Sequence, residues 1–431
     1  MTEFFELLRK NRNYRYTWTG QLVSEIGDHF NNIAVFSLAL EHTRSGRVVS
    51  GIMLSRAIPA VLAGPLTGVL LDRLNRKRIM IWSDLLRAVV ALCFIITVTH
   101  HESWRLYALS GLLMFASPFF TSGRSSILPS ITSRKELHTA NSLTQTTQWT
   151  TLTIGTLLAG MSVTQFGYRW AFFLNALSFL FSALCISRLR LPGDGFRARR
   201  RALTEAEVVR PWHEYVEGIR YMRANPLLFG IALVGVGWAA GGGAAQILFS
   251  LFGELVFNRG PAGIGVIWGS AGVGLLVGGA LAYQIGRHVT FEQYKRAIVI
   301  CYIVHGSAYV IFSQMTNFYL ALLFIALSRS AIAVSSVLNV GQLLRYVSDE
   351  YRGRVFATLE SMVWFTMMIS MMLAGIASQY YSPRVIGACA GALSSVTAIF
   401  WAWGNSSGRL PKPQPQFIGA DEIEVHGEPT V

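Results

Sequence analysis

The stretch Gly68-Val-Leu-Leu-Asp-Arg-Leu-Asn-Arg-Lys-Arg78 decides the fold of this chain. It is a short, strongly basic gap between two long apolar runs, at 48–71 and 78–99. Each run has the length of about 20 residues that a helix needs to cross the hydrocarbon core of a bilayer. A basic cluster between two such runs is typical of a connection at a membrane surface.

The same alternation of apolar run and short gap continues along the 431 residues. Hydrophobic residues make up 52% of the chain and charged residues only 14%, whereas about 25% of the residues of a soluble domain are charged. The net charge of +14 does not indicate a nucleic-acid-binding protein, because the basic residues lie in the gaps between apolar runs. The pattern predicts helices at 15–41, 48–71, 78–99, 104–130, 139–166, 168–189, 226–252, 262–286, 294–314, 317–345, 354–381 and 383–404.

Twelve predicted spans in two sets of six indicate a duplicated membrane protein. We predict an all-α membrane protein in which twelve transmembrane helices form two pseudo-symmetric six-helix bundles, at 1–189 and 226–404. A basic linker at 190–225 joins them, and its mixed stretch Trp212–Arg223 is compatible with an amphipathic surface helix. A tail at 405–431, rich in proline and then in acids, is predicted to be disordered.

The distribution of Arg and Lys predicts the orientation. If the N-terminus is cytoplasmic, most of the 37 basic residues fall on that side, and both termini and the linker lie inside. This orientation predicts a multi-pass protein of the bacterial inner membrane. The opposite loops then carry only Arg44, Arg47, Arg105, Arg169, Arg259 and Arg384, and the spans carry Arg56, Arg87, Arg124 and Arg329.

The gap at 68–78 resembles the loop signature of the major facilitator superfamily, with a glycine, an Asp-Arg pair four residues on, and a basic cluster. Asn75 stands where the family has a glycine, and asparagine also tolerates a left-handed turn. The resemblance implies that Asp72 meets the start of the eleventh span, near Arg352 and Arg354, and latches the outward-open state. The alternative is that the basic residues only set the topology. The residues of this motif are Gly68, Asp72, Arg73, Arg76, Lys77 and Arg78.

Within that superfamily the chain resembles the branch of macrolide-efflux proteins and the enterobactin exporter. This resemblance implies a secondary active transporter, with proton-coupled efflux of a drug, siderophore or related metabolite. The stretches that carry it are Asn13-Tyr-Arg15 with Gly20-Gln21, Ser24 and Gly27-Asp28; Arg56-Ala-Ile-Pro59 with Gly64-Pro65; Asp84-Leu-Leu-Arg87; Arg124 with Leu128-Pro129 and Ala140-Asn-Ser-Leu143; and Arg352-Gly-Arg354.

Ionisable residues inside a membrane span cost free energy, so their presence indicates a functional role. In the first span, spacings of three and four residues place a polar stripe on one helical face, made of Gln21, Glu25, Asp28, His29 and Asn32. Arg56, descending on the second span, reaches the depth of Asp28. We predict an ion pair of Glu25 or Asp28 with Arg56 that couples transport to protons. The alternatives are a static salt bridge and substrate contact.

A second cluster near the cytoplasmic end combines Asp84 and Arg87 of the third span with Arg124 of the fourth. Together with Asp72 these residues favour a gating network over substrate binding. The predicted substrate cavity contains polar and aromatic side chains from both halves. They are Gln21, Asn32, Gln145, Gln148, Trp149, Asn175, Trp238, Arg329, Asn339 and Trp364.

Three other functions remain open from the sequence: a lysophospholipid transporter of the same fold, a nutrient importer, and a non-transporting receptor or scaffold. The sequence contains no nucleotide-binding loop, nucleophile arrangement or metal-ligand spacing, so we expect neither an enzyme nor a bound cofactor or metal. The expected partners are a small-molecule substrate, protons and the lipid bilayer, with the protein acting as a monomer.

Overall fold

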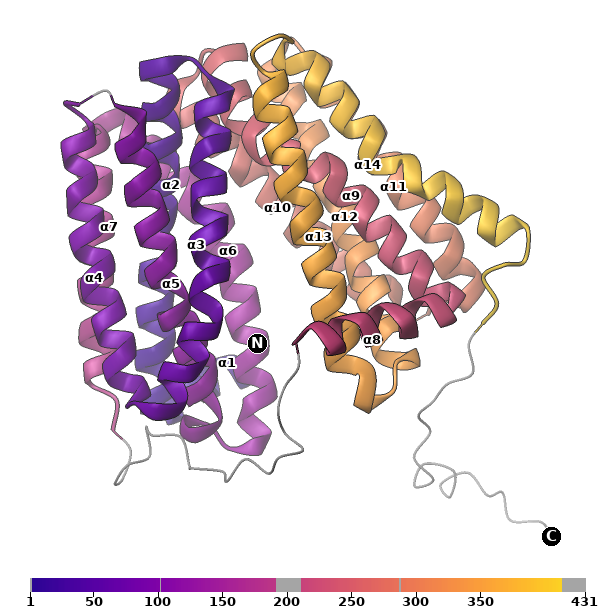
Figure 1. Cartoon of the computed structure of the whole chain (residues 1–431), viewed down its shortest axis with the longest axis horizontal. Coiled ribbons are helices and arrows are strands. Elements are labelled where there is room, and N and C mark those ends of the chain that lie inside the picture. Colours follow the sequence, from indigo (N-terminus) through magenta and orange to yellow (C-terminus); the bar gives the residue numbers. More distant parts are fainter. Residues whose placement is uncertain (1, 101, 191–210, 287, 413–431) are drawn as a thin grey trace.

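The computed structural model describes residues 2–100, 102–190, 211–286 and 288–412, and these ranges contain fifteen helices (Figure 1). The basic stretch of the linker at 191–210 and the tail at 413–431 lie outside the described residues. The first half contains α1 (Thr2–Lys10), α2 (Arg12–Thr43), α3 (Gly46–Arg73), α4 (Arg76–Thr97), α5 (Ser103–Ile131), α6 (Arg134–Phe166) and α7 (Tyr168–Ser187).

The second half begins with α8 (Pro211–Ala224), a helix that covers the linker stretch Trp212–Arg223. Figure 1 shows α8 lying across one end of this half rather than along the other helices. The remaining elements are α9 (Pro226–Leu251), the π-helical turn η2 (Phe252–Val256), α10 (Gly260–Gly286), α11 (Phe291–Gln314), α12 (Phe318–Tyr346), α13 (Asp349–Ala377) and α14 (Pro383–Ser406).

The all-helical membrane fold is confirmed, although two long helices are more polar than the rest. Ten helices within the described ranges are long and apolar enough to span a bilayer. The other two long helices, α2 with 32 residues and α6 with 33, have the length but not the hydropathy. Polar groups inside a bilayer must face other protein groups or a water-filled cavity. We therefore expect α2 and α6 to line the interior of the molecule.

Local sequence signals explain where the helices begin and end. Ser133 caps α6 in a reciprocal pair with Glu136, and Thr290 caps α11 in the same way with Gln293, so the first free N–H groups of both helices are satisfied. Gly167 joins α6 to α7 with φ +82°, a conformation that favours glycine.

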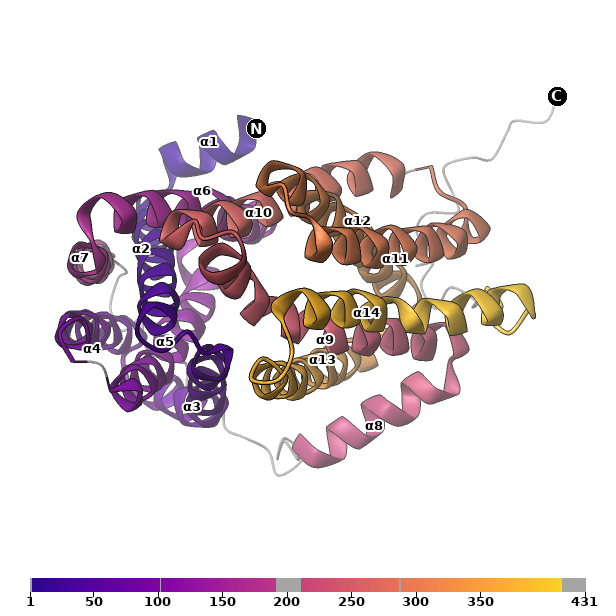
Figure 2. The ribbon, with the colours of Figure 1, turned by 90° about the horizontal axis from the view of Figure 1, so that it is seen from above.

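The two halves meet at one end and diverge at the other, where α1 and α8 lie (Figure 1). We call the diverging end the linker end and the other the far end. At the far end α6 packs against α10, and α3 packs against α13, as the view from above also shows (Figure 2). The Ser50 hydroxyl donates a hydrogen bond of 2.9 Å to the Met371 carbonyl across the second seam.

Glycines make the seam between α6 and α10 close. A Cβ at Gly265 would clash with the Thr156 carbonyl oxygen, and one at Gly160 would lie 2.7 Å from the Pro261 carbonyl oxygen. Small residues allow helix backbones to approach in this way inside a membrane. Towards the linker end, a Cβ at Gly68, Gly341 or Gly353 would meet no atom within 4 Å.

Replacing Gly265 with leucine should destabilise the protein, because overpacking of this kind typically costs about 1–3 kcal/mol. The midpoint of thermal unfolding in detergent should fall below that of the unaltered protein. Gly341→Ala is the matched control, since its site is open and alanine favours a helix, so its midpoint should stay or rise. Equal midpoints for the unaltered protein and Gly265→Leu would contradict close packing at this seam.

Candidate functional site

A hydrogen-bonded carboxylate lies at the centre of the first half. The Gln21 amide donates to one carboxylate oxygen of Glu25 at 2.7 Å, and the Thr151 hydroxyl of α6 donates to the other at 3.0 Å. Arg124 of α5 lies 3.7 Å from the first oxygen. One carboxylate therefore joins α2, α5 and α6 inside the bundle.

Arg56 of α3 does not form the predicted ion pair with Glu25 or Asp28. Its guanidinium donates a 2.7 Å hydrogen bond to the side-chain oxygen of Asn32 and lies 5.0 Å from the centre of the Phe36 ring. Two further nitrogens of this buried guanidinium have no hydrogen-bond partner among the described residues. Glu25 instead pairs with Arg124 of α5, and Arg56 lies level with Asn32, about two turns further along α2.

Asp84 and Arg87 form a buried ion pair within α4, one turn apart. The Arg87 guanidinium lies between two aromatic rings, 4.6 Å from the centre of Phe120 and 4.3 Å from that of Phe179. Cation–π contacts of this kind stabilise a desolvated cation. The pair is therefore held in place by packing.

Asp28 of α2 lies within electrostatic range of these charged groups. It is half-buried on α2 and makes no direct hydrogen bond or ion pair with another described residue. Electrostatic interactions act on it from Arg87 and Arg56, and also from Glu25 and Asp84. Of the acids in this cluster it is the one whose charge is balanced only at a distance.

A cavity of about 310 Å³ lies between the halves, mostly within the second one. Trp149 of α6 and Trp238 of α9 line it together with Asn339 of α12, as predicted for a substrate cavity. The wall is largely apolar, and Tyr302 and Ser335 add hydroxyl groups. Asn339 also accepts a 2.8 Å hydrogen bond from the Tyr294 hydroxyl, which orients its amide.

The other predicted cavity residues lie elsewhere. Asn175 is fully buried on α7 beside Gly27 of α2, because it packs in a helix seam. Arg329 is buried in the second half, 5.0 Å from the centre of the Phe249 ring. Gln145 and Gln148 on α6 and Trp364 on α13 are exposed and do not line the 310 Å³ cavity.

The predicted latch is open. Asp72 is exposed and bonds to no described residue, while Arg354 pairs at 3.0 Å with Glu217 of α8. Asn75 does not adopt a left-handed turn; at φ −72° it caps α4 by accepting a hydrogen bond from the Arg78 N–H. Gly68 makes no close helix contact in this conformation.

The basic residues of the latch loop have different surroundings. Arg76 donates to the Ser126 carbonyl at 2.9 Å and Lys77 to the Leu189 carbonyl at 2.8 Å, so both tie the loop to its own half. Arg73 and Arg78 are exposed. Arg352 donates to the Leu344 carbonyl at 3.3 Å.

One polar contact between the halves was not predicted from the sequence. At the far end the Ser37 hydroxyl of α2 donates a 2.8 Å hydrogen bond to Glu254 in η2. Tyr168 of α7 joins the group through Ser37, at 3.3 Å, and by donating to Glu41. The sequence shows Glu254 as a single acid at the end of its span, which could have singled it out. It does not show the π-helical turn that orients this side chain towards Ser37.

Two bundles of six long helices around a cavity, with charges inside one bundle, define a secondary transporter. The family model described as Major Facilitator Superfamily matches residues 17–292, and the chain belongs to this superfamily. Members of this superfamily are transporters and not enzymes.

Two curated relatives span nearly all of the chain. Macrolide efflux protein A of Streptococcus pyogenes is 24% identical over 377 residues, which cover 86% of this chain and 91% of the relative. The putative bacilysin exporter BacE of Bacillus subtilis (strain 168) is 22% identical over 375 residues, covering 87% and 90%. A bacterial homologue of the iron transporter ferroportin, in an inward-facing state, shares the fold with a TM-score of 0.65 and 16% identity over 91% of this chain and 98% of that one.

Removing Arg124 should leave Glu25 without its cation. We expect Arg124→Gln to lower the free energy of unfolding by roughly 1–3 kcal/mol. The double variant Glu25→Gln/Arg124→Gln should lose less than the sum of the two single variants, since neither charge is then left alone.

The exposed pair Glu102 and Arg105, 3.3 Å apart, provides a matched control cycle, in which we expect a coupling of only about 0–1 kcal/mol. Denaturant or thermal unfolding in detergent measures both cycles. Strictly additive losses at Glu25 and Arg124 would contradict a direct interaction.

Proposed function

We propose that this protein is a proton-coupled exporter of small organic molecules that works by alternating access. The observation that carries the proposal is Asp28, an acid without a direct partner that lies between the charges of α3 and α4. Proton antiport requires such a group, whose charge can be removed without breaking a packed ion pair. The names of the two relatives, an efflux protein and a putative exporter, support the outward direction.

The orientation follows from the basic residues. The linker end carries α1, α8 and the loop with Arg73 and Arg78, and we place it in the cytoplasm of a bacterial inner membrane. The conformation then faces inward, because the halves diverge towards that end and are closed by the glycine seam and by Ser37 and Glu254 at the other.

Proton binding changes the balance around Asp28. A proton arriving from the outside neutralises Asp28 and removes its attraction to Arg87 and Arg56, which favours the state that reloads from the cytoplasm. Loss of this proton to the cytoplasm restores the attraction. Since Glu25 accepts two hydrogen bonds and pairs with Arg124, it serves to position α2 and to shape the field on Asp28.

The cavity supports a mainly lipophilic substrate. Trp149 and Trp238 offer faces on which a ring can stack, while Asn339 and Ser335 supply a few hydrogen bonds. We propose a monomer as the transporting unit.

Arg354 provides the switch at the linker end. In the inward-facing state it pairs with Glu217. In the opposite state we propose that it exchanges this partner for Asp72 as the halves close. The helix α8 would then be released when the cavity opens outward.

Replacing Asp28 with asparagine should reduce pH-gradient-driven efflux to background, because the side chain no longer exchanges a proton. The assay uses everted vesicles or proteoliposomes, an imposed pH gradient, and a panel of lipophilic compounds. Glu102→Gln is the control, since this acid lies in an exposed far-end pair. Undiminished coupling in Asp28→Asn would remove this residue from the mechanism.

Replacing Glu217 with glutamine should free Arg354 and shift the population towards the outward-facing state. Spin labels at positions 74 and 344, exposed leucines of the two halves, should then report a shorter distance in a cysteine-free background. Glu292→Gln, which removes another exposed acid at 2.9 Å from a lysine, is the control. An unchanged distance distribution in Glu217→Gln would rule out partner exchange.

A further inference from the structure

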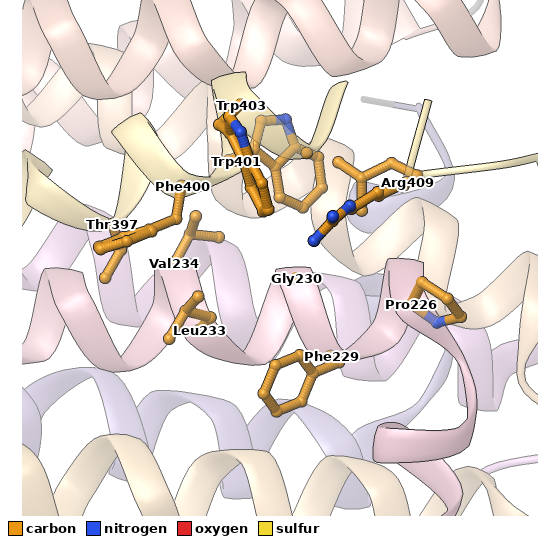
Figure 3. Close-up of a pocket in the computed structure, with 12 residues that line it drawn as sticks. Pro226, Phe229, Gly230, Leu233, Val234, Thr397, Phe400, Trp401, Trp403 and Arg409 are labelled. Carbon is orange, nitrogen blue, oxygen red and sulfur yellow. The ribbon is translucent and has the colours of Figure 1, made fainter. Parts of the chain in front are cut away.

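A groove of about 280 Å³ lies on the outside of the second half, between the start of α9 and the end of α14 (Figure 3). Its walls include Phe229, Leu233, Phe400 and Trp403, whose side chains are between 36% and 57% exposed. In a helix bundle that spans a bilayer, exposed apolar side chains on the outer surface contact lipid. The groove is therefore open to the membrane near the linker end.

The groove depends on specific backbone features. Gly230 forms part of its floor, and a Cβ there would lie 2.9 Å from the Trp401 ring. After α14, Gly408 turns the chain back with φ +71°, and the Arg409 N–H donates to the Gly404 carbonyl at 2.9 Å. Leu410 is buried, and its carbonyl accepts a 3.3 Å hydrogen bond from Lys295. This turn fixes the position of Arg409.

Arg409 reaches over the groove (Figure 3). Its guanidinium lies 4.2 Å from the centre of the Trp403 ring and forms no ion pair or hydrogen bond with a described residue through its side chain. A guanidinium that stacks on a ring keeps its N–H groups free at the edge, and these match the oxygens of a phosphate.

A second groove, of about 340 Å³, lies on the other side of the same wall. Phe229 and Leu233 line both grooves. Met222 and Arg223, near the end of α8, also line the second one. Arg223, in the last turn of α8, is exposed and has no ion pair among the described residues. Two apolar grooves thus share one ridge, and an arginine lines each of them.

We propose that these grooves form a binding site for one anionic diacyl phospholipid of the cytoplasmic leaflet. The two acyl chains lie on either side of the ridge of Phe229 and Leu233, and the phosphate lies between Arg409 and Arg223. Two arginines and two apolar channels favour a two-chain phosphate lipid over a single-chain substrate or a protein helix. The site is separate from the transport cavity and does not rest on the proposed direction of transport, although the choice of the cytoplasmic leaflet rests on the proposed orientation.

The test uses phosphatidylglycerol that carries a diazirine on one acyl chain, in nanodiscs of phosphatidylcholine, with cross-links mapped by peptide mass spectrometry. We expect the cross-links to concentrate on α9, α14 and the end of α8. Arg409→Gln/Arg223→Gln should reduce them by about fivefold or more, the effect expected when basic groups beside an anionic lipid are lost. Leu233→Trp enlarges the shared ridge and so fills part of both grooves without adding charge. It should also reduce the cross-links.

The control is Arg345→Gln. Arg345 is an exposed linker-end arginine that lies 5.8 Å from the centre of a ring, that of Tyr346, but it lines neither groove. Its removal should leave the cross-links unchanged. Thermal unfolding in detergent verifies that each variant is folded.

Three outcomes would overturn the proposal. One is equal labelling of all outward-facing helices. Another is equal labelling by a phosphatidylcholine probe of the same chain length, which would show an apolar groove without phosphate recognition. The third comes from native mass spectra of the unaltered protein and the double arginine variant. If the variant loses a bound second copy of the chain and not bound phosphatidylglycerol, the grooves are a contact between protein copies.

Discussion

The hydrogen-bonded carboxylate of Glu25 is the interaction on which the interior of the first half depends. A charge within a bilayer requires partners from the protein, since the hydrocarbon offers none. Gln21, Thr151 and Arg124 supply them from three helices. Because this acid is satisfied, Asp28 one turn further along α2 can remain without a direct partner. These different surroundings fit a structural role for Glu25 and the proposed proton exchange for Asp28.

The same constraint explains why α2 and α6 are the most polar of the long helices. Both occupy the inner side of the first half, where α6 contributes Thr151 to the charge cluster and Trp149 to the cavity. The helices α4 and α7 carry exposed apolar side chains on their outer faces and are more apolar. The more polar long helices of the first half therefore mark the side that faces the proposed transport path. At the far end, the glycine seam between α6 and α10 closes this path.

The sequence was sufficient for the helices and the two sets of six, because apolar length and basic gaps are local properties. It also identified the members of the charge cluster, but it paired Arg56 with the wrong residue. Depth along a helix can be counted from a sequence, whereas the choice between Asn32 and an acid depends on how α3 and α5 rotate about their axes. Asn175 was misplaced for a similar reason: a polar residue in a span faces either a cavity or a helix seam, and only packing decides.

The π-helical turn η2 gives the far end a mechanical property of its own. A π turn holds one residue more than an α turn, and such single-turn insertions are frequent at functional sites. If η2 rewinds as α-helix, the residues beyond it shift together by one position, a rotation of about 100° about the helix axis. Glu254 would then swing away from Ser37 without any stretching of α9. The contact between Glu254 and Ser37 can thus be broken by a screw motion of five residues rather than by movement of a whole helix.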